Sequence, residues 1–184
     1  MAHIIITGSS KGIGAYLFDQ LKKTHNVIGI SRSKGKRTTH QVDITDKVKL
    51  KKIISKITYI DILINNASVS NVVRDEIKNF DDTVLVNLNG TFYCSNYALP
   101  KLKKSKIKKI INISSINAHV ALPNNPGYVA SKGGINALTK SLAVDYGKYG
   151  IKANSISLGY IRDGMSKKSF SNKKKRGERT KNGR

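Results

Sequence analysis

The sequence predicts an α/β protein built on a doubly wound parallel sheet. Short runs of apolar, mostly β-branched residues recur along the chain, and segments with helical spacing of apolar residues separate them. Buried parallel strands read as continuous apolar runs and are joined by crossover helices, so this alternation indicates βαβ units with helices on both faces of the sheet. At 184 residues, the chain has the length of one domain that can bury a sizeable core.

Five runs are predicted as buried strands, and a sixth run is a weaker candidate. The strong candidates lie at His3–Thr7, Val27–Ser31, Asp61–Ile64, Lys109–Ser114 and Lys152–Leu158, and the weaker one is Thr39–Val42. Four stretches between them place apolar side chains on one helical face, at spacings of three and four residues. Their stripes are Ile13, Leu17 and Leu21; Leu50, Ile53, Ile54 and Ile57; Val84, Leu88 and Phe92; and Ile135, Leu138 and Leu142.

The chain is strongly basic, with 34 Lys and Arg against 11 Asp and Glu and a formal charge of +23. The stretch 170–184 contains no Leu, Ile, Val or Met, so it buries too little apolar surface to offset its ordering entropy. We therefore predict one domain over residues 1–165 and a flexible basic tail over 166–184. A solvated terminus explains this tail more simply than a nucleic-acid arm, because Phe170 is its one aromatic residue.

Composition also argues against several other classes of protein. No apolar run approaches the roughly 20 residues that cross a bilayer, and the N-terminus lacks the features of a signal peptide. We therefore expect a cytoplasmic protein with no membrane partner. The single cysteine, Cys94, excludes an internal disulfide framework. The four histidines show no metal-ligand spacing, so no metal site is expected.

A glycine-rich turn, Thr7–Gly14, follows the first strand and opens a helix. In this setting Gly8 permits the tight turn, Gly12 lets the backbone approach a pyrophosphate, and Gly14 lets helix and strand pack closely. The helix N-terminus then offers unpaired N–H groups and a partial positive charge to phosphates. An ordinary β–α turn can also carry glycines, but the strand before and the helix after favour a dinucleotide site.

The residues after the second strand bear on which dinucleotide binds. A residue near the end of that strand, about 20 positions beyond the glycine turn, contacts the adenosine ribose in such folds, and an acid there selects NAD. Ser31 and Arg32 occupy this region, and neither can act as that acid. Arg32 can hold a 2′-phosphate, and Lys11 adds a second cation. The pattern favours NADP(H) over NAD(H), unless Arg32 is simply one more basic residue of a basic chain.

Five motifs occur in a fixed order: TGSSKGIG at 7–14, NNA at 65–67, Asn87 in VNLNG, Ser115 in INISS, and Tyr128–Lys132, which reads YVASK. Together they resemble the short-chain dehydrogenase/reductase family, in its subgroup that includes 3-oxoacyl-carrier-protein reductases. The resemblance covers about residues 3–165 and implies a Rossmann fold. It also implies an oxidoreductase that transfers a hydride between NADP(H) and a small carbonyl or secondary alcohol substrate.

The expected chemistry centres on Tyr128 and Lys132, which are four residues apart and share a helical face. A neighbouring ammonium favours phenolate and lowers the pKa of a tyrosine, which suits Tyr128 to exchange a proton with the substrate oxygen. Ser115 can hydrogen-bond the same oxygen. The resemblance adds a bond from Lys132 to the nicotinamide ribose and a water-mediated proton relay at Asn87. Read singly, Asn87 could satisfy backbone groups at a helix bend, Ser115 could cap a turn, and Tyr128 could be a surface aromatic.

The resemblance also assigns the remaining cofactor contacts. It places Asn66 and Ala67 beside the adenosine ribose, Asp43 and Ile44 at the adenine, and Ile161 at the nicotinamide carboxamide. The complete set predicted to bind the cofactor is Gly8, Ser10, Lys11, Gly12, Ile13, Gly14, Arg32, Asp43, Ile44, Asn66, Ala67, Tyr128, Lys132 and Ile161.

The chain departs from the family pattern at four points. Ser68 replaces a usual Gly, Leu158 replaces a usual Pro, and Asp163 stands where a Thr commonly contacts the cofactor. The fold is also expected to lack the family's usual last strand and helix, which would leave Lys152–Leu158 at an exposed sheet edge. An alternative follows, in which the chain binds NADP(H) but has little or no turnover.

Partners are predicted from the same resemblance. Family members pair through two helices that correspond to Asp81–Lys103 and Gly127–Tyr149, so we predict a homodimer or a higher homo-oligomer. A nucleic-acid partner is disfavoured.

Overall fold

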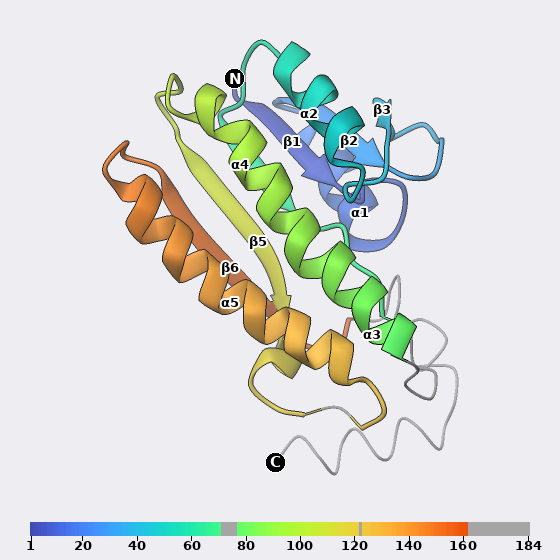
Figure 1. The fold of residues 1–184 in the computed structure, drawn as a ribbon. Helices are drawn as coiled ribbons and strands as arrows, with labels where there is room; N and C mark the ends of the chain where they lie inside the picture. Colours follow the sequence, from blue (N-terminus) through green and yellow to red (C-terminus); the bar gives the residue numbers. More distant parts are fainter. Residues whose placement is uncertain (71–76, 122, 162–184) are drawn as a thin grey trace.

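In the part of the chain that the structure describes, six parallel strands form one sheet (Figure 1). They are β1 (His3–Thr7), β2 (Asn26–Ser31), β3 (His40–Gln41), β4 (Ile62–Asn65), β5 (Lys109–Ser115) and β6 (Lys152–Leu158). Their spatial order is β3-β2-β1-β4-β5-β6, and every neighbouring pair is parallel. This is the doubly wound arrangement that the sequence predicts. Strand order reverses between β1 and β4, and ligands bind beyond the carboxyl ends of the strands at such a point.

The computed structural model describes residues 1–70, 77–121 and 123–161. Asp163 and the predicted tail 166–184 lie outside these ranges, so the expectations about them are not tested by the structure. Within the described ranges, no helix is both long and apolar enough to traverse a bilayer.

In the described ranges, five α-helices accompany the sheet: α1 (Gly12–Leu21), α2 (Lys47–Lys56), α3 (Ile77–Val84), α4 (Gly90–Leu102) and α5 (Pro126–Gly147). The larger core cluster packs side chains of α2, α4 and α5 against one face of the sheet, with Leu50, Leu102 and Leu142 almost fully buried. Figure 1 shows α4 and α5 running along this face. The smaller cluster packs Phe18 of α1 against Ile4 and Ile6 on the opposite face.

The predicted stripes on α2 and α5 are confirmed, because Leu50, Ile54, Ile135 and Leu142 are all buried. The stripe Val84, Leu88 and Phe92 is wrong in part, since Phe92 is 42% exposed. The cause is a π-helical turn, Leu85–Asn89, which joins α3 to α4. Its wider turn shifts the helical register, so buried Asn87, Thr91 and Cys94 face the core instead.

Among the described residues, β6 is the edge strand next to β5, as the sequence predicts. Seven residue pairs hold it in register, from Lys109–Lys152 to Ser115–Leu158. Ile156 on this strand is 46% exposed. The register brings Leu158 level with Ser115, which places the end of β6 beside the site described next.

Candidate active site

A cleft of about 220 Å³ lies at the carboxyl ends of the strands and collects most of the predicted site residues. The predicted residues that line it are Gly8, Ser10, Lys11, Gly12, Ile13, Arg32, Asp43, Ile44, Asn66, Ala67, Ser115, Tyr128, Lys132 and Ile161. Gly14 and Asn87 are not in the lining. The glycine turn and the Tyr128–Lys132 helix, far apart in the sequence, therefore open into one cavity.

The glycine turn holds a conformation and a spacing that side chains would disturb. Gly8 has φ of +70°, in the left-handed region, and its N–H donates to the carbonyl of Ile30 at 2.7 Å. A Cβ built on Gly14 would lie 2.2 Å from Gly8 O and 2.4 Å from Asn66 Nδ2. Gly14 thus shapes the turn from behind, as predicted, without facing the cleft. Lys11 at the start of α1 provides no side-chain cap, so this helix end keeps amide donors for an anion.

Thr7 and Asn66 join the ends of β1 and β4 beneath the cleft. The backbone N–H groups of Asn66 and Ala67 both donate to Thr7 Oγ1 at 3.0 Å. The Asn66 side chain donates to the carbonyls of Thr7 and Gly8 at 3.0 and 3.2 Å. These bonds fix the glycine turn against β4, so part of the predicted role of Asn66 is structural.

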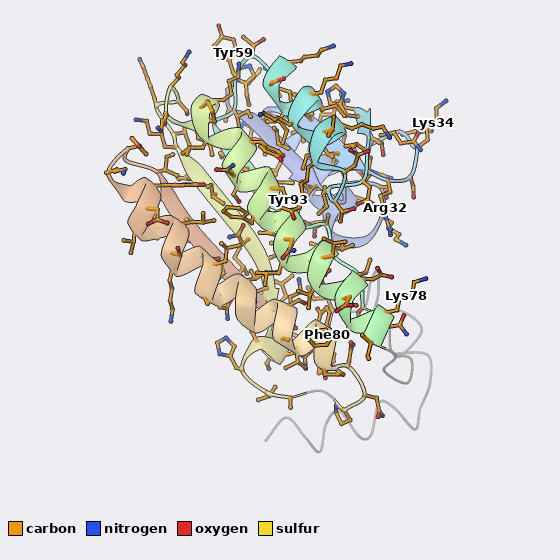
Figure 2. All side chains as sticks on the ribbon, in the orientation of Figure 1. Arg32, Lys34, Tyr59, Lys78, Phe80 and Tyr93 are labelled. Carbon is orange, nitrogen blue, oxygen red and sulfur yellow. The ribbon has the colours of Figure 1, made fainter. Side chains whose placement is uncertain are left out.

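Arg32 and Asp43 form the outer end of the cleft. Arg32 follows β2 (Figure 2), and its Nη1 lies 3.6 Å from Asp43 Oδ2. The Arg32 side chain is 60% exposed, so the pair is weak and the guanidinium keeps donors toward solvent. Asp43 is positioned by the N–H and hydroxyl of Thr45, at 2.9 and 2.8 Å. Ser31 contributes differently from Arg32, since its Oγ accepts from Ser10 N at 3.1 Å and fixes the glycine turn to β2.

Tyr128 lies in the first turn of α5, four residues before Lys132. Burial raises the pKa of Tyr128; a hydrogen bond with Ser115 acts to lower it, and Tyr160 acts to raise it. This direction is opposite to the depression that the sequence predicts. The reason is burial, because desolvation disfavours the charged phenolate. Lys132 Nζ donates to the carbonyl of Ile113 at 2.8 Å and lies 5.5 Å from the centroid of the Tyr128 ring.

Lys132 is 2% exposed, and burial lowers its pKa to about 8. Desolvation disfavours the charged form of an amine, so this lysine loses its proton more readily than one in water. The carbonyl of Lys132 accepts from Ser114 Oγ at 3.2 Å, which ties α5 to the end of β5. Hydrogen bonds therefore hold Lys132 at its backbone carbonyl and at its side-chain Nζ.

Ser115 caps a turn and lines the cleft at the same time. Its Oγ accepts from Asn117 N at 3.1 Å and donates to Asn117 Oδ1 at 3.2 Å, at the start of the 3₁₀ helix Ile116–Ala118. This contact is the capping role that the residue suggests when read singly. The same residue also interacts with Tyr128, so its position serves the site as well.

Asn87 is fully buried in the π-helical turn, and its side chain serves the backbone. Oδ1 accepts from Val69 N at 2.8 Å, while Nδ2 donates to Val69 O at 2.9 Å and to Ser131 Oγ at 3.0 Å. The amide therefore clamps the segment after β4 to α5. These bonds fit the structural alternative considered for Asn87, and the water-mediated proton relay stays a prediction.

Several lining residues were not predicted for the site. They are Ile30, Ser33, Val42, Ser68, Val69, Val86, Ile113, Ser114, Leu158 and Gly159. Most follow or end strands, so their position in the sheet, rather than their residue type, is the signal that could have found them.

Comparisons with known proteins agree with this geometry. The family model described as short chain dehydrogenase matches residues 2–174. The uncharacterized oxidoreductase YxbG of Bacillus subtilis is 36% identical over 182 residues, covering 85% of this chain and 66% of that protein. The 3-oxoacyl-[acyl-carrier-protein] reductase FabG of Rickettsia conorii is 33% identical over 182 residues, covering 89% of this chain and 74% of the relative.

A solved structure supports the fold. A short chain dehydrogenase from Burkholderia cenocepacia J2315, in complex with NADP, superposes with a TM-score of 0.83 at 28% identity, over 91% of this chain and 75% of that one. The chain thus spans about two thirds to three quarters of the length of these relatives. The family-model match, these identities and the parallel sheet with its glycine turn show that the chain belongs to the short-chain dehydrogenase/reductase family.

Proposed function

We propose that the protein is an NADP(H)-dependent oxidoreductase that interconverts a carbonyl compound and a secondary alcohol. The observation that carries the proposal is a shared cavity. Ser115, Tyr128 and Lys132 line the same cleft as the glycine turn at the start of α1. A proton donor and a dinucleotide can therefore reach one substrate from adjoining walls.

The residues of the cleft fit a dinucleotide. Gly14 leaves no room for a Cβ against the glycine turn, and the uncapped start of α1 offers amide donors to a pyrophosphate. Arg32 and Lys11 both line the cleft, and their positive charge suits the negative charge that a 2′-phosphate would add. The NADP in the Burkholderia relative indicates only that a chain of this fold can hold that cofactor, so the choice of NADP over NAD rests on Arg32 and Lys11.

In the proposed reaction, the bound dinucleotide supplies a hydride to a carbonyl carbon or accepts one from an alcohol. Tyr128 Oη donates its proton to the substrate oxygen as the C=O double bond becomes C–OH, and takes that proton back in the reverse direction. The raised pKa keeps Tyr128 protonated near neutral pH, which suits it to donate in the reduction. Ser115 orients the oxygen, and buried Lys132 places a cation near the ring that favours phenolate when the proton leaves.

NADPH oxidation with a panel of ketones and 3-oxoacyl thioesters tests this proposal. The wild type should turn over at least one class. Tyr128→Phe should lose kcat by at least about 100-fold, because general acid catalysis contributes roughly that much, while the dissociation constant for NADPH changes little.

The control variant is Tyr16→Phe, which removes a phenol from an exposed side chain of α1 that does not line the cleft. It should behave as wild type. Tight NADPH binding without turnover on any substrate would instead favour the alternative of a binding protein with little activity. Equal turnover by Tyr128→Phe and wild type would overturn the assigned chemistry.

A further inference from the structure

A second hollow lies on the surface that α2 and α4 form together. It has a volume of about 410 Å³ and is lined by Lys47, Val48, Lys51, Lys52, Ser55 and Tyr97. None of these residues lines the cleft, so the hollow is separate from the candidate active site. We call it the lysine groove, and the proposed reaction gives it no role.

The two sides of the lysine groove come from two helices that pack side by side on one face of the sheet (Figure 1). On α2, Lys47, Lys51 and Ser55 follow one another every four residues and share a helical face. On α4, Tyr93 and Tyr97 have the same spacing. The Nζ of Lys47 lies 5.2 Å from the centroid of the Tyr93 ring, which is labelled in Figure 2. One side therefore carries cations and the other carries aromatic rings.

The positive charge of the lysine groove is not neutralised by neighbouring side chains. Lys47, Lys51 and Lys52 are exposed, and none of them has a carboxylate within 4.0 Å in the part of the chain that the structure describes. The acid next to them in sequence, Asp46, accepts from the N–H of Lys49 and pairs with its Nζ at 3.0 Å. Like charges four residues apart destabilise a helix, so an anion bound in the groove would relieve this repulsion.

Tyr97 gives the groove an aromatic wall. Its side chain packs against the larger core cluster and is partly exposed, so the ring is held in place while it borders the groove. A fixed aromatic ring beside several cations is the arrangement that binds single-stranded nucleic acids, because a base stacks on the ring while the lysines pair with phosphates. An acidic peptide would use the lysines but not the ring.

We propose that the lysine groove binds single-stranded nucleic acid, with phosphates at Lys47, Lys51 and Lys52 and a base stacked on Tyr97. Lysine ammonium groups act as point charges and do not read base edges, so binding should tolerate many sequences. The proposal goes beyond the oxidoreductase and does not depend on it. The sequence disfavours a nucleic-acid partner because the basic tail has one aromatic residue. The fold instead brings Tyr97 next to lysines that lie far from it along the chain.

Fluorescence anisotropy with the full chain and a labelled oligothymidylate of about 12 nucleotides tests the role of the lysines. The wild type should bind, and its affinity should fall steeply as salt rises. The triple variant Lys47→Gln, Lys51→Gln, Lys52→Gln should bind at least about 10-fold more weakly at low salt. Its slope of log affinity against log salt should be smaller by about 2, since each phosphate contact on a single strand contributes about 0.7.

The matched control for charge is the triple variant Lys22→Gln, Lys23→Gln, Lys34→Gln. It removes the same number of charges from exposed lysines that do not line the groove, and it should stay within about threefold of the wild type. Both triple variants keep the basic stretch 166–184, so its contribution cancels in the comparison.

The role of the ring is tested separately. Tyr97→Ala should weaken oligothymidylate binding by about 5-fold or more, the lower end of what base stacking contributes. Tyr97→Phe keeps the ring and should bind within about twofold of the wild type, which separates stacking from the hydroxyl. Tyr59→Ala, at a 63% exposed tyrosine outside the groove, should also bind within about twofold. Melting temperatures of all three variants show that binding is measured on folded protein.

Three results would overturn the proposal while leaving the proposed function intact. Equal losses in the two triple variants would mean that only net charge matters. Oligoglutamate that competes as well as unlabelled oligothymidylate of similar length would mean that the groove takes an acidic peptide. Release of the oligonucleotide by NADPH at a concentration that just fills the cleft would place the strand in the cleft, whereas the proposal predicts that it stays bound.

Discussion

The surroundings of single side chains in the cleft set the pKa of each ionisable group there. Burial acts in opposite directions on the two groups at the centre of the site, raising the pKa of Tyr128 and lowering that of Lys132. Both shifts favour the neutral form, so the proton on the phenol is held more firmly and the proton on the amine less firmly. This balance determines how activity should respond to pH.

Alcohol oxidation should become faster as pH rises through the neutral range. The reaction in that direction needs Tyr128 as phenolate, and a raised pKa leaves the phenolate scarce at neutral pH. Below the pKa, the phenolate fraction grows about tenfold per pH unit, so kcat/KM for oxidation should climb steeply, while kcat/KM for reduction stays nearly flat. The measurement is a pH profile in both directions, with NADP binding followed at each pH. A flat oxidation profile would show that Tyr128 does not accept the proton.

Arg32 should discriminate between the two dinucleotides. Arg32→Ala is expected to raise the NADPH dissociation constant by about 5- to 10-fold, a modest loss because the guanidinium is 60% exposed and screened. The NADH dissociation constant should change less than about twofold, since NADH lacks the 2′-phosphate. Lys34→Ala is the control, because Lys34 is exposed on the same loop (Figure 2) and does not line the cleft. An equal rise in the dissociation constants for NADPH and NADH would refute the proposed preference for NADP(H).

The π-helical turn shows how one element positions another. Leu85–Asn89 interrupts the run from α3 to α4 and turns Asn87 into the core, where it holds Val69 and Ser131 together. That clamp sets the wall of the cleft next to Ser68. The predicted stripe assumed a regular α-helix through this region. The π-helical turn could not be foreseen, because nothing in the residue types of Leu85–Asn89 distinguishes a π turn from an α turn.

Removing the clamp should cost stability. Asn87→Ala leaves both backbone groups of Val69 without their partner, so the free energy of unfolding should fall by about 2 kcal/mol or more. Denaturant unfolding measures this change. Asn96→Ala, at an exposed position of α4, should change the free energy by less than about 0.5 kcal/mol. Similar values for both variants would mean that the clamp contributes little.

At the scale of the whole molecule, the sequence predicts the sheet well because its signals are local. β1 and β6 have the predicted bounds, and each predicted strand lies within one residue of an observed one at each end. The glycine turn and the YVASK motif at 128–132 likewise predict where the cleft lies. Hydrogen-bond partners and pKa directions could not be predicted, since the Ile113 carbonyl that holds Lys132 and the burial that acts on Tyr128 depend on long-range packing.

The predicted pairing of subunits through α4 and α5 stays a prediction. Phe92 on α4 and Val144 on α5 are exposed apolar side chains on these helices, at 42% and 78%, which is compatible with an interface there.

The central claim is that this cleft transfers a hydride between NADP(H) and a carbonyl carbon. NADPH carrying deuterium at its hydride-donating position, incubated with the protein and a ketone that it reduces, tests the claim most directly, with mass spectrometry of the alcohol as the readout. The account predicts one deuterium per molecule of alcohol, bound to the carbinol carbon. It also predicts that Tyr128→Phe forms this labelled alcohol far more slowly than the wild type does. Alcohol without deuterium, or no alcohol from any ketone despite NADPH binding, would contradict it.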